Sequence, residues 1–319
     1  MKNGQRLYYA YSDYLKEKYG EKVYKLPINI PVSCPNRMDG EGGCSFCAGC
    51  GTGFEAMSSL TPVAKQLEHT KKLIESKYHA HKFIAYFQNY TNTFLPLADF
   101  KHYIEEAASI PDIAAVSIST RPDCVRRKYL EALKETAEKH RIDVTVELGL
   151  QTVNYHTLRA INRGHGIAEF IDAVLVIREY GFEICTHVIL NLPGDDITDC
   201  TETARVISSL RTSSVKIHSL YIAKNTRLCE DFENGTISVC GEEEYIRRLI
   251  AFLENLNPDI AIERLFSRIP QKDAVFSNWG KSWWALRDEF IEQMSLQGSY
   301  QGKCFHYLGG AALDKLQGA

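Results

Sequence analysis

The sequence predicts an α/β protein built as a partial (β/α)6 barrel of the TIM type, followed by a C-terminal extension. Six short runs rich in β-branched and apolar residues recur along the chain. The longer stretches between them carry apolar residues at the three- and four-residue spacing of amphipathic helices. Strands that alternate with helices favour βαβ units and a parallel sheet. Six units are too few for a closed eightfold barrel, so we expect an incomplete one.

The expected elements follow one another in a regular order. A Tyr-rich helix ends near Gly20, within an N-terminal segment at residues 1–22. The expected strands lie at residues 23–32, 82–89, 113–120, 144–150, 182–190 and 214–222. Helical segments separate them, for example at residues 60–78 and 168–181. We assign residues 23–240 to the barrel and residues 241–319, which hold a helix (242–256) and a short strand (259–266), to an extension that is a candidate substrate-binding region.

Net charge, apolar run length and the distribution of cysteines limit the classes of protein to which this chain can belong. The chain has 319 residues and a net charge of −3, so no general basic field indicates nucleic acid, although a local basic patch is compatible with it. The start of the chain lacks the apolar region of a signal peptide, and no apolar run is long enough to cross a membrane. We therefore expect a cytoplasmic protein without a membrane partner. Cysteines are clustered: four lie at residues 34–50, whereas six are scattered and expected to be small buried apolar residues: Cys124, Cys185, Cys200, Cys229, Cys240 and Cys304.

Each expected strand is followed by a polar segment. These segments read QNYTNT, STRPD, QTVNYH, NLPGDD and AKNTRL after strands two to six, and the cysteine-rich segment follows the first strand. Polar residues are common in turns, so each segment alone is weak evidence of a site. In a barrel of parallel strands, however, the carboxyl ends of all strands meet at one rim, where chemistry is located. The sequence therefore predicts a site at this rim.

The cysteine segment CPNRMDGEGGCSFCAGC has the spacing C-x9-C-x2-C-x2-C. Cys44 and Cys47 can bind one metal centre from a single tight turn, with Gly42 and Gly43 relieving backbone strain beside it. Thiolates suit a structural zinc ion, an electron-carrying iron–sulfur cluster, or a cluster held by three cysteines that leaves one iron open. A second C-x2-C pair for zinc does not occur, nor do the downstream cysteine and proline of ferredoxins. We therefore favour the third interpretation, a cluster held by three cysteines that leaves one iron open.

The string CPNRMDGEGGCSFC resembles the cysteine loop of radical SAM proteins, and most closely the branch that contains the elongator catalytic subunit. Phe46, just before the last ligand, fits that pattern. The resemblance implies a [4Fe–4S] cluster on Cys34, Cys44 and Cys47, and S-adenosylmethionine (SAM) as a second cofactor. Cys50 has no counterpart in the family and is expected to be a spectator. The likeness runs from about residue 8 to residue 302, and it is closest to a small bacterial subfamily with the same CPNR and STRPD context.

The same resemblance implies the SAM contacts. The loop after the second strand binds the methionine amino group in the family. Here it lacks the usual glycines and offers Gln88, Asn89, Tyr90 and Thr91, so an ordinary polar turn is an equal alternative. The segment at residues 147–165 looks like that of the oxygen-independent coproporphyrinogen oxidases. Gln151 would then bind the SAM ribose and Arg163 the SAM carboxylate, and Gly194 in LPGD would lie beside the adenine.

Four polar residues on expected strands need separate explanations. Glu147 is costly in an apolar strand unless it is paired, so we predict a cofactor contact there. His187 is more simply explained as a satisfied core histidine. Lys216 and His218 share one face of their strand. If that face is the barrel interior, Lys216 is a functional candidate; if it faces a helix, its chain lies along apolar surface with the charge in solvent.

The resemblance implies reductive cleavage of SAM to a 5′-deoxyadenosyl radical, with an electron donor such as flavodoxin or ferredoxin. The elongator-like loop points to tRNA as substrate, at the ring substituent of the wobble uridine. Because the chain ends soon after residue 317, we expect no acetyltransferase domain and therefore a different reaction on tRNA. The stretch 264–290 mixes cations with tryptophans, which suits nucleic acid or a packed helix: Arg264, Arg268, Lys272, Lys281, Arg287, Trp279, Trp283 and Trp284. The alternatives are a radical enzyme for a small metabolite or tetrapyrrole precursor, and a zinc-bound, non-enzymatic RNA-binding protein.

Overall fold

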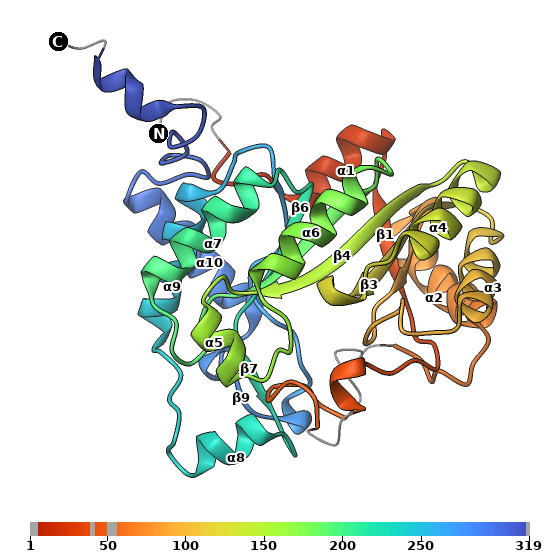
Figure 1. Ribbon diagram of the computed structural model, residues 1–319, viewed down its shortest axis with the longest axis horizontal. Helices are drawn as coiled ribbons and strands as arrows, with labels where there is room; N and C mark the ends of the chain where they lie inside the picture. Colours follow the sequence, from red (N-terminus) through yellow and green to blue (C-terminus); the bar gives the residue numbers. More distant parts are fainter. Residues whose placement is uncertain (1–5, 39–41, 50–55, 317–319) are drawn as a thin grey trace.

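A parallel sheet curled into a half-barrel forms the centre of the computed structural model, which describes residues 6–38, 42–49 and 56–316 (Figure 1). The sheet has seven strands in the order β1-β2-β3-β4-β5-β6-β8, and every neighbouring pair is parallel. The strands are β1 (Val23–Ile28), β2 (Lys82–Phe87), β3 (Ile113–Thr120), β4 (Asp143–Gln151), β5 (Glu183–Ile189), β6 (Ser214–His218) and β8 (Ala261–Arg264). The predicted partial barrel is confirmed, with a seventh strand supplied by the expected C-terminal region.

Helices flank the sheet and continue into the C-terminal region. They are α1 (Tyr11–Tyr19), α2 (Val63–Tyr78), α3 (Leu97–Ala108), α4 (Arg127–His140), α5 (Tyr155–Ala160), α6 (Ile167–Arg178), α7 (Ile197–Ser209), α8 (Arg227–Glu233), α9 (Glu242–Asn255) and α10 (Trp283–Leu296). Short 3₁₀ turns lie at η1 (Pro35–Arg37), η2 (Pro122–Cys124), η3 (Gln271–Asp273), η4 (Asn278–Gly280) and η5 (Ala311–Leu316). No helix in the described ranges is both long enough and apolar enough to cross a membrane.

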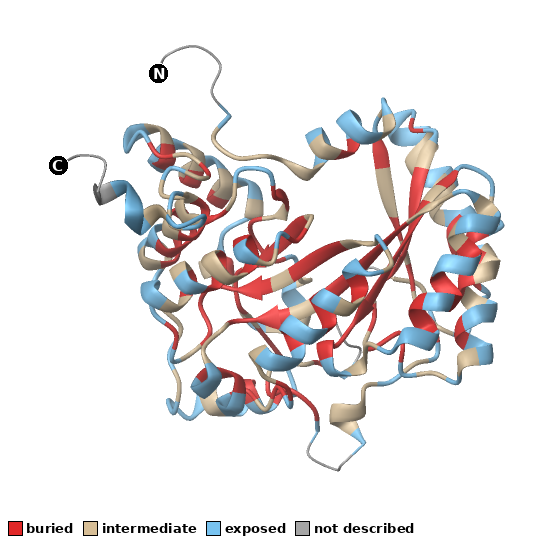
Figure 2. Ribbon diagram, turned by 45° about the horizontal axis from the view of Figure 1, so that its top comes forward, coloured by how far each residue is buried: buried red, intermediate tan, exposed pale blue. Residues whose placement is uncertain are grey.

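The strands are nearly all buried, whereas the helices expose one face (Figure 2). Apolar strand residues such as Phe83, Phe87 and Val146 are fully buried and pack in one continuous core with helix residues such as Leu67 and Phe170. Burial on both faces explains why these strands read as apolar runs rather than as strict alternations. The positions that point into the half-barrel are the exception, because many of them are polar.

The run at residues 214–222, expected as one strand, is divided in the structure. β6 ends at His218, and Tyr221–Ala223 forms β7, which pairs antiparallel with β9 (Ala274–Ser277) in a separate two-stranded sheet. At the break, side-chain oxygens accept the hydrogen bonds of backbone amides. Ser219 Oγ accepts from the Ser267 amide at 2.9 Å, and Asn191 Oδ1 accepts from the Leu220 amide at 2.6 Å. This small sheet carries the chain away from the barrel toward α8.

Candidate active site at the rim of the half-barrel

The cysteine loop begins six residues after β1, at the rim where the strands end. The Cys34 carbonyl accepts from the Arg37 amide at 3.0 Å, and the Cys44 carbonyl accepts from the Cys47 amide at 2.9 Å. The predicted tight turn between the second and third cysteines is therefore present. Gly42 and Gly43 have φ values of 76° and 90°, which confirms that glycine relieves strain there. Cys50 lies outside the described residues.

The loop is fixed to the segment that follows β4. The Ser45 amide donates to the Ile161 carbonyl at 2.9 Å, and Asn162 Nδ2 donates to the Gly43 carbonyl at 3.0 Å. In return, Asn36 Nδ2 donates to the Asn162 carbonyl at 2.7 Å. These bonds bring the cysteines next to the segment in which Arg163 is the predicted SAM contact.

Each of the three predicted ligand thiols faces a guanidinium. Arg163 Nη1 lies 3.5 Å from Cys44 Sγ, Arg121 Nη1 lies 3.9 Å from Cys34 Sγ, and Arg37 Nη1 lies 3.9 Å from Cys47 Sγ. Cationic N–H donors favour the thiolate form that binds metal and stabilise negative charge on cluster sulfur. This set of thiols and donors suits an anionic iron–sulfur centre.

Arg121 was not among the residues selected from the sequence, although it lies in the STRPD segment that was. Its Nε and Nη2 donate to the two carboxylate oxygens of Asp123 at 2.9 and 2.8 Å. Burial opposes the charge of Arg121, but Asp123 raises the pKa of the guanidinium. The bidentate pair fixes the direction of the remaining nitrogen toward Cys34. The spacing Arg-x-Asp was the available signal for this arrangement.

Without metal, the thiol of Cys47 resists ionisation. Burial raises the pKa of Cys47 to about 11, and the neighbouring Cys44 adds to the effect, while Arg37 opposes it. A metal centre that binds these sulfurs as thiolates must therefore release protons.

Arg163 and Gln151 lie together beside the second cysteine. Arg163 Nη2 donates to the Gly149 carbonyl at 2.7 Å, and a Cβ at Gly149 would lie 2.5 Å from Arg163 Nη2 and 2.8 Å from Gln151 Nε2. Gln151 itself has a φ of 77°, unusual for a residue with a side chain. Arg163 Nε is buried and has no hydrogen-bond partner in the described part of the chain. An unpaired buried donor at this point indicates a missing acceptor.

The loop after β2 lies against the start of the cysteine loop. The Thr91 amide donates to the Ser33 carbonyl at 3.4 Å, and the Tyr90 hydroxyl donates to the Gly49 carbonyl. Asn89 Oδ1 and Thr91 Oγ1 are buried, and neither has a partner among the described residues. Both atoms can accept from an ammonium group.

The LPGD turn after β5 contains Gly194 with a φ of 95°, and a Cβ there would lie 3.3 Å from Thr157 Oγ1. Only glycine takes this backbone conformation without strain. The adjacent Asp195 is buried, and burial raises its pKa to about 6. The turn is thus close-packed beside α5, which follows Gln151.

A cavity of about 690 Å³ extends from this rim into the half-barrel. Phe46, Gln88 and Gln151 line it together with inward-facing residues of the strands, among them Tyr86 and His187. Its volume is typical of a small-molecule site.

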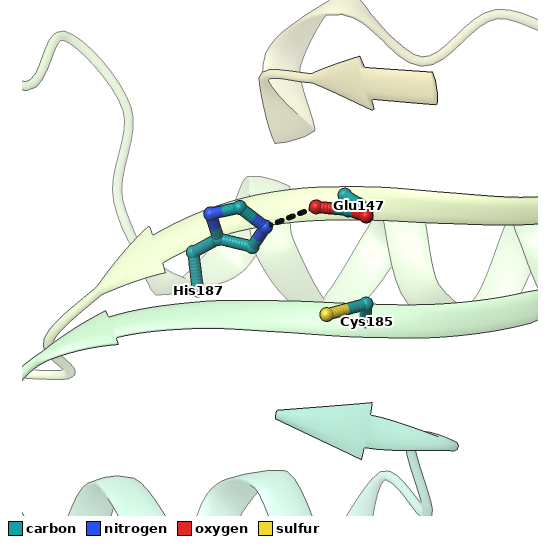
Figure 3. Close-up of side chains that lie close together, drawn as sticks. All are labelled: Glu147, Cys185 and His187. Atoms are coloured by element: carbon teal, nitrogen blue, oxygen red, sulfur yellow. Dashed lines mark hydrogen bonds and ion pairs between the residues drawn. The ribbon is translucent and has the colours of Figure 1, made fainter. Parts of the chain in front are cut away.

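Inside the half-barrel, Glu147 lies at the centre of a layer of buried charges. Its carboxylate accepts from Lys25 Nζ at 2.6 Å, Lys216 Nζ at 2.9 Å, His187 Nε2 at 2.6 Å and Ser117 Oγ at 2.8 Å (Figure 3 shows His187). Burial alone would raise the pKa of Glu147, but the two ammonium groups and His187 hold it well below its usual range. Lys216 therefore faces the barrel interior, and His187 is a satisfied core histidine, as expected.

Most of the tryptophans in the stretch 264–290, and the scattered cysteines, are packed against neighbouring residues. Trp279 donates from Nε1 to the Cys240 carbonyl at 2.9 Å, and Trp283 packs against the core, whereas Trp284 is exposed. Of the scattered cysteines, Cys185, Cys200 and Cys229 are buried as expected, and the other three are half-buried.

Comparisons with known proteins agree with this geometry. The model of the radical SAM superfamily matches residues 28–207, and that of the radical SAM C-terminal domain matches residues 212–295. The YtqA protein of Bacillus subtilis is 32% identical over 309 residues, which cover 96% of this chain and 95% of that protein. A tRNA uridine(34) acetyltransferase of Methanocaldococcus jannaschii is 28% identical over 164 residues, 49% of this chain but 29% of the relative.

The structure of the archaeal Elp3 of Methanocaldococcus infernus, lacking its first 46 residues, has the same fold: the TM-score is 0.69 at 17% identity, over 88% of this chain and 64% of that one. Membership of the radical SAM family implies SAM and a [4Fe–4S] cluster as cofactors. With a matching family model over more than half of its length and a relative of nearly the same extent, this chain belongs to the radical SAM superfamily and is an enzyme of that class.

Proposed function

We propose that Cys34, Cys44 and Cys47 hold a [4Fe–4S] cluster and leave its fourth iron open for SAM. The proposal is supported by membership of the family, which implies such a cluster, and by the guanidinium at each of these three thiols, because cationic N–H donors stabilise negative charge on thiolate and cluster sulfur. When bound, such a cluster supplies the electron that breaks a carbon–sulfur bond of SAM and releases a 5′-deoxyadenosyl radical. A flavodoxin or ferredoxin would deliver that electron.

The residues of this chain would bind and orient SAM. Arg163, whose Nε has no partner among the described residues, would take the carboxylate, and Gln151 the ribose hydroxyls. Gln88, Asn89 and Thr91 would accept from the ammonium group. Gly194 would allow the LPGD backbone to approach the adenine.

Glu147 would act differently from the other predicted cofactor contacts. Four donors already occupy its carboxylate. We therefore assign it to the floor of the cavity, where it would hold Lys25, Lys216 and His187 in place beneath the substrate.

The anaerobically purified protein tests the cluster directly. We expect a brown protein with about four iron and four sulfide per chain, as the cluster formula requires, that forms 5′-deoxyadenosine from SAM with dithionite. A colourless protein that contains zinc and no labile sulfide would contradict the proposal and favour the zinc-bound alternative.

For the substrate, we propose a nucleotide of tRNA, with the reaction at the ring substituent of the wobble uridine. The support is the likeness to a tRNA uridine(34) acetyltransferase over half of this chain. A small metabolite is the second candidate, because a cavity of about 690 Å³ suits a free small molecule as well.

Deletion of the gene separates these substrates. Nucleosides from total tRNA of the deletion strain are compared by mass spectrometry with those of the parent and of a complemented strain. We expect one modified uridine to be lost and its precursor to accumulate. An unchanged tRNA profile would favour the small-metabolite alternative.

A further inference from the structure

The cavity has a positive lining in a chain whose net charge is −3. Among the described residues that line it, Glu263 is the one carboxylate, while five side chains are basic: Lys25, Lys216, Arg264, Arg268 and Arg287. Because the chain as a whole carries a net negative charge, its composition does not explain this local excess of basic side chains.

The two lysines are already neutralised. Lys25 Nζ lies 2.6 Å from Glu147 and 2.7 Å from Glu263, and Lys216 Nζ lies 2.9 Å from Glu147 and 3.5 Å from Glu263. Two ammonium groups and two carboxylates thus form a compact set without net charge. The excess charge of the cavity comes from the arginines.

Among the described residues, one of these arginines has no ion-pair partner, and another pairs only with an exposed carboxylate at the surface. No carboxylate of the described part of the chain forms an ion pair with Arg264, which ends β8. Arg287 Nη2 donates to the exposed Asp288 at 3.1 Å, but its Nε is buried without a partner in the described ranges. Half-buried guanidinium groups with unused donors are placed to receive an oxyanion.

Flat apolar surface lies next to these charges. Arg268 stacks over the ring of Trp283 with 4.0 Å to the centroid, and Tyr8 and Phe266 also line the cavity. A ligand that carries a planar ring beside its acidic group would contact both kinds of surface.

A metal ion is a poorer occupant of this interior. Ligand atoms of Glu147, Cys185 and His187 lie within 4.8 Å of one another (Figure 3). However, the Glu147 carboxylate is shared by the ammonium groups of Lys25 and Lys216, which would repel a divalent cation. The excess of arginines in the cavity favours an anion instead.

We propose that Arg264 and Arg287 form an oxyanion subsite in the half-barrel, which binds a carboxylate or phosphate group of a substrate with a planar ring. This inference rests on the proposed function, because it places the substrate in the cavity that Gln88 and Gln151 share with SAM. It adds the chemical class of the substrate: a molecule or nucleotide whose reacting part enters the cavity with a negative group attached.

Isothermal titration of the anaerobically purified protein tests the subsite with three probes of the same ring: benzoate, phenyl phosphate and benzamide. We expect at least one of the anions to bind about tenfold or more tightly than the neutral amide. Arg264→Gln and Arg287→Gln should each remove most of that difference. Arg247→Gln on α9, which also removes one arginine but from an exposed site away from the cavity, should leave it unchanged.

Benzamide binding as tightly as both anions, or folded Arg264→Gln and Arg287→Gln proteins that keep the wild-type preference, would overturn the proposal. Thermal unfolding checks that each variant is folded, and the use of two variants guards against failure of one. The tighter of the two anions identifies the acidic group as carboxylate or phosphate. The titration requires neither iron nor SAM cleavage, so a failure of the cluster assignment and a failure of the subsite give different results.

Discussion

Two polar regions of the half-barrel differ in how completely their groups are paired. At the rim, which we define as Cys34, Cys44, Cys47 and the facing arginines, cations point at thiols and Arg163 keeps a buried nitrogen without a described partner. In the interior charge layer, defined as Lys25, Glu147, His187, Lys216 and Glu263, each charged group contacts an opposite charge or a hydrogen-bond partner. Incomplete pairing indicates a ligand that completes the site, whereas complete pairing indicates a part of the fold.

The largest effect that we expect is the loss of the cluster when a cysteine of the rim is replaced. Replacement of Cys34, Cys44 or Cys47 by alanine should abolish cluster binding and lower 5′-deoxyadenosine formation by about a thousandfold or more, because three thiolates are needed to hold the cluster. Iron, labile sulfide and the visible spectrum after anaerobic reconstitution measure the loss.

Cys240→Ala is the matched control for these three variants. Cys240 is half-buried, and its carbonyl rather than its sulfur takes part in a hydrogen bond, with Trp279. We expect this variant to retain iron and activity. Full iron content in any of the three rim variants would assign the cluster to other ligands.

In the interior, the next largest effect should fall on stability. Glu147→Gln leaves Lys25 and Lys216 buried with too little negative charge, so we expect the free energy of unfolding to fall by about 3–5 kcal/mol. Urea denaturation measures the change. Glu179→Gln, which removes a carboxylate paired with Arg127 on the surface, should leave stability near that of the wild type. A Glu147→Gln protein as stable as the control would show that the layer is not structural.

The two regions also differ in how far the sequence predicts them. The cysteines of the rim and Arg163 could be selected from the sequence, because the cysteine spacing and polar strand ends are local patterns, whereas Arg37 and Arg121 beside the thiols were not selected. For the interior layer, Glu147, His187 and Lys216 could be singled out but their pairing could not, because the partners come from β1, β4, β5, β6 and β8 and meet only when the sheet curls. Lys25 reads as an ordinary strand lysine until Glu147 is placed beside it. The membership of β8 in the sheet and the break after His218 depended likewise on distant side chains, such as Asn191.

A pH experiment compares Asp195, in the LPGD turn after β5, with the interior carboxyl of Glu147. Burial raises the pKa of Asp195 to about 6, whereas the lysines hold that of Glu147 well below its usual range. Because the folded pKa of Asp195 lies above the unfolded value of 3.8, the protein takes up a proton there on folding, and stability is lost as pH rises from about 4 to 6.

Asp195→Asn should therefore be more stable than the wild type by about 2 kcal/mol at pH 8, and the difference should shrink toward zero as the pH falls below about 4. Urea denaturation of both proteins across this range isolates the contribution of Asp195, since all other titrations are shared. A difference that is constant with pH would mean that Asp195 keeps an ordinary pKa.

The smallest effect is expected on the affinity for SAM, in a variant whose stability should not change. In Gly149→Ala the added methyl group would lie 2.5 Å from Arg163 Nη2 and 2.8 Å from Gln151 Nε2. Both contacts are with the ends of long side chains, which can move, so the thermal midpoint should remain near that of the wild type. Their displacement should nevertheless weaken SAM binding about tenfold, because Arg163 and Gln151 are the proposed contacts to its carboxylate and ribose. Gly241→Ala, which meets no neighbour within 4 Å, is the control. Equilibrium dialysis with labelled SAM measures the affinity; unchanged binding in Gly149→Ala would move the SAM site away from these two residues, and a large loss of stability would make Gly149 a packing residue instead.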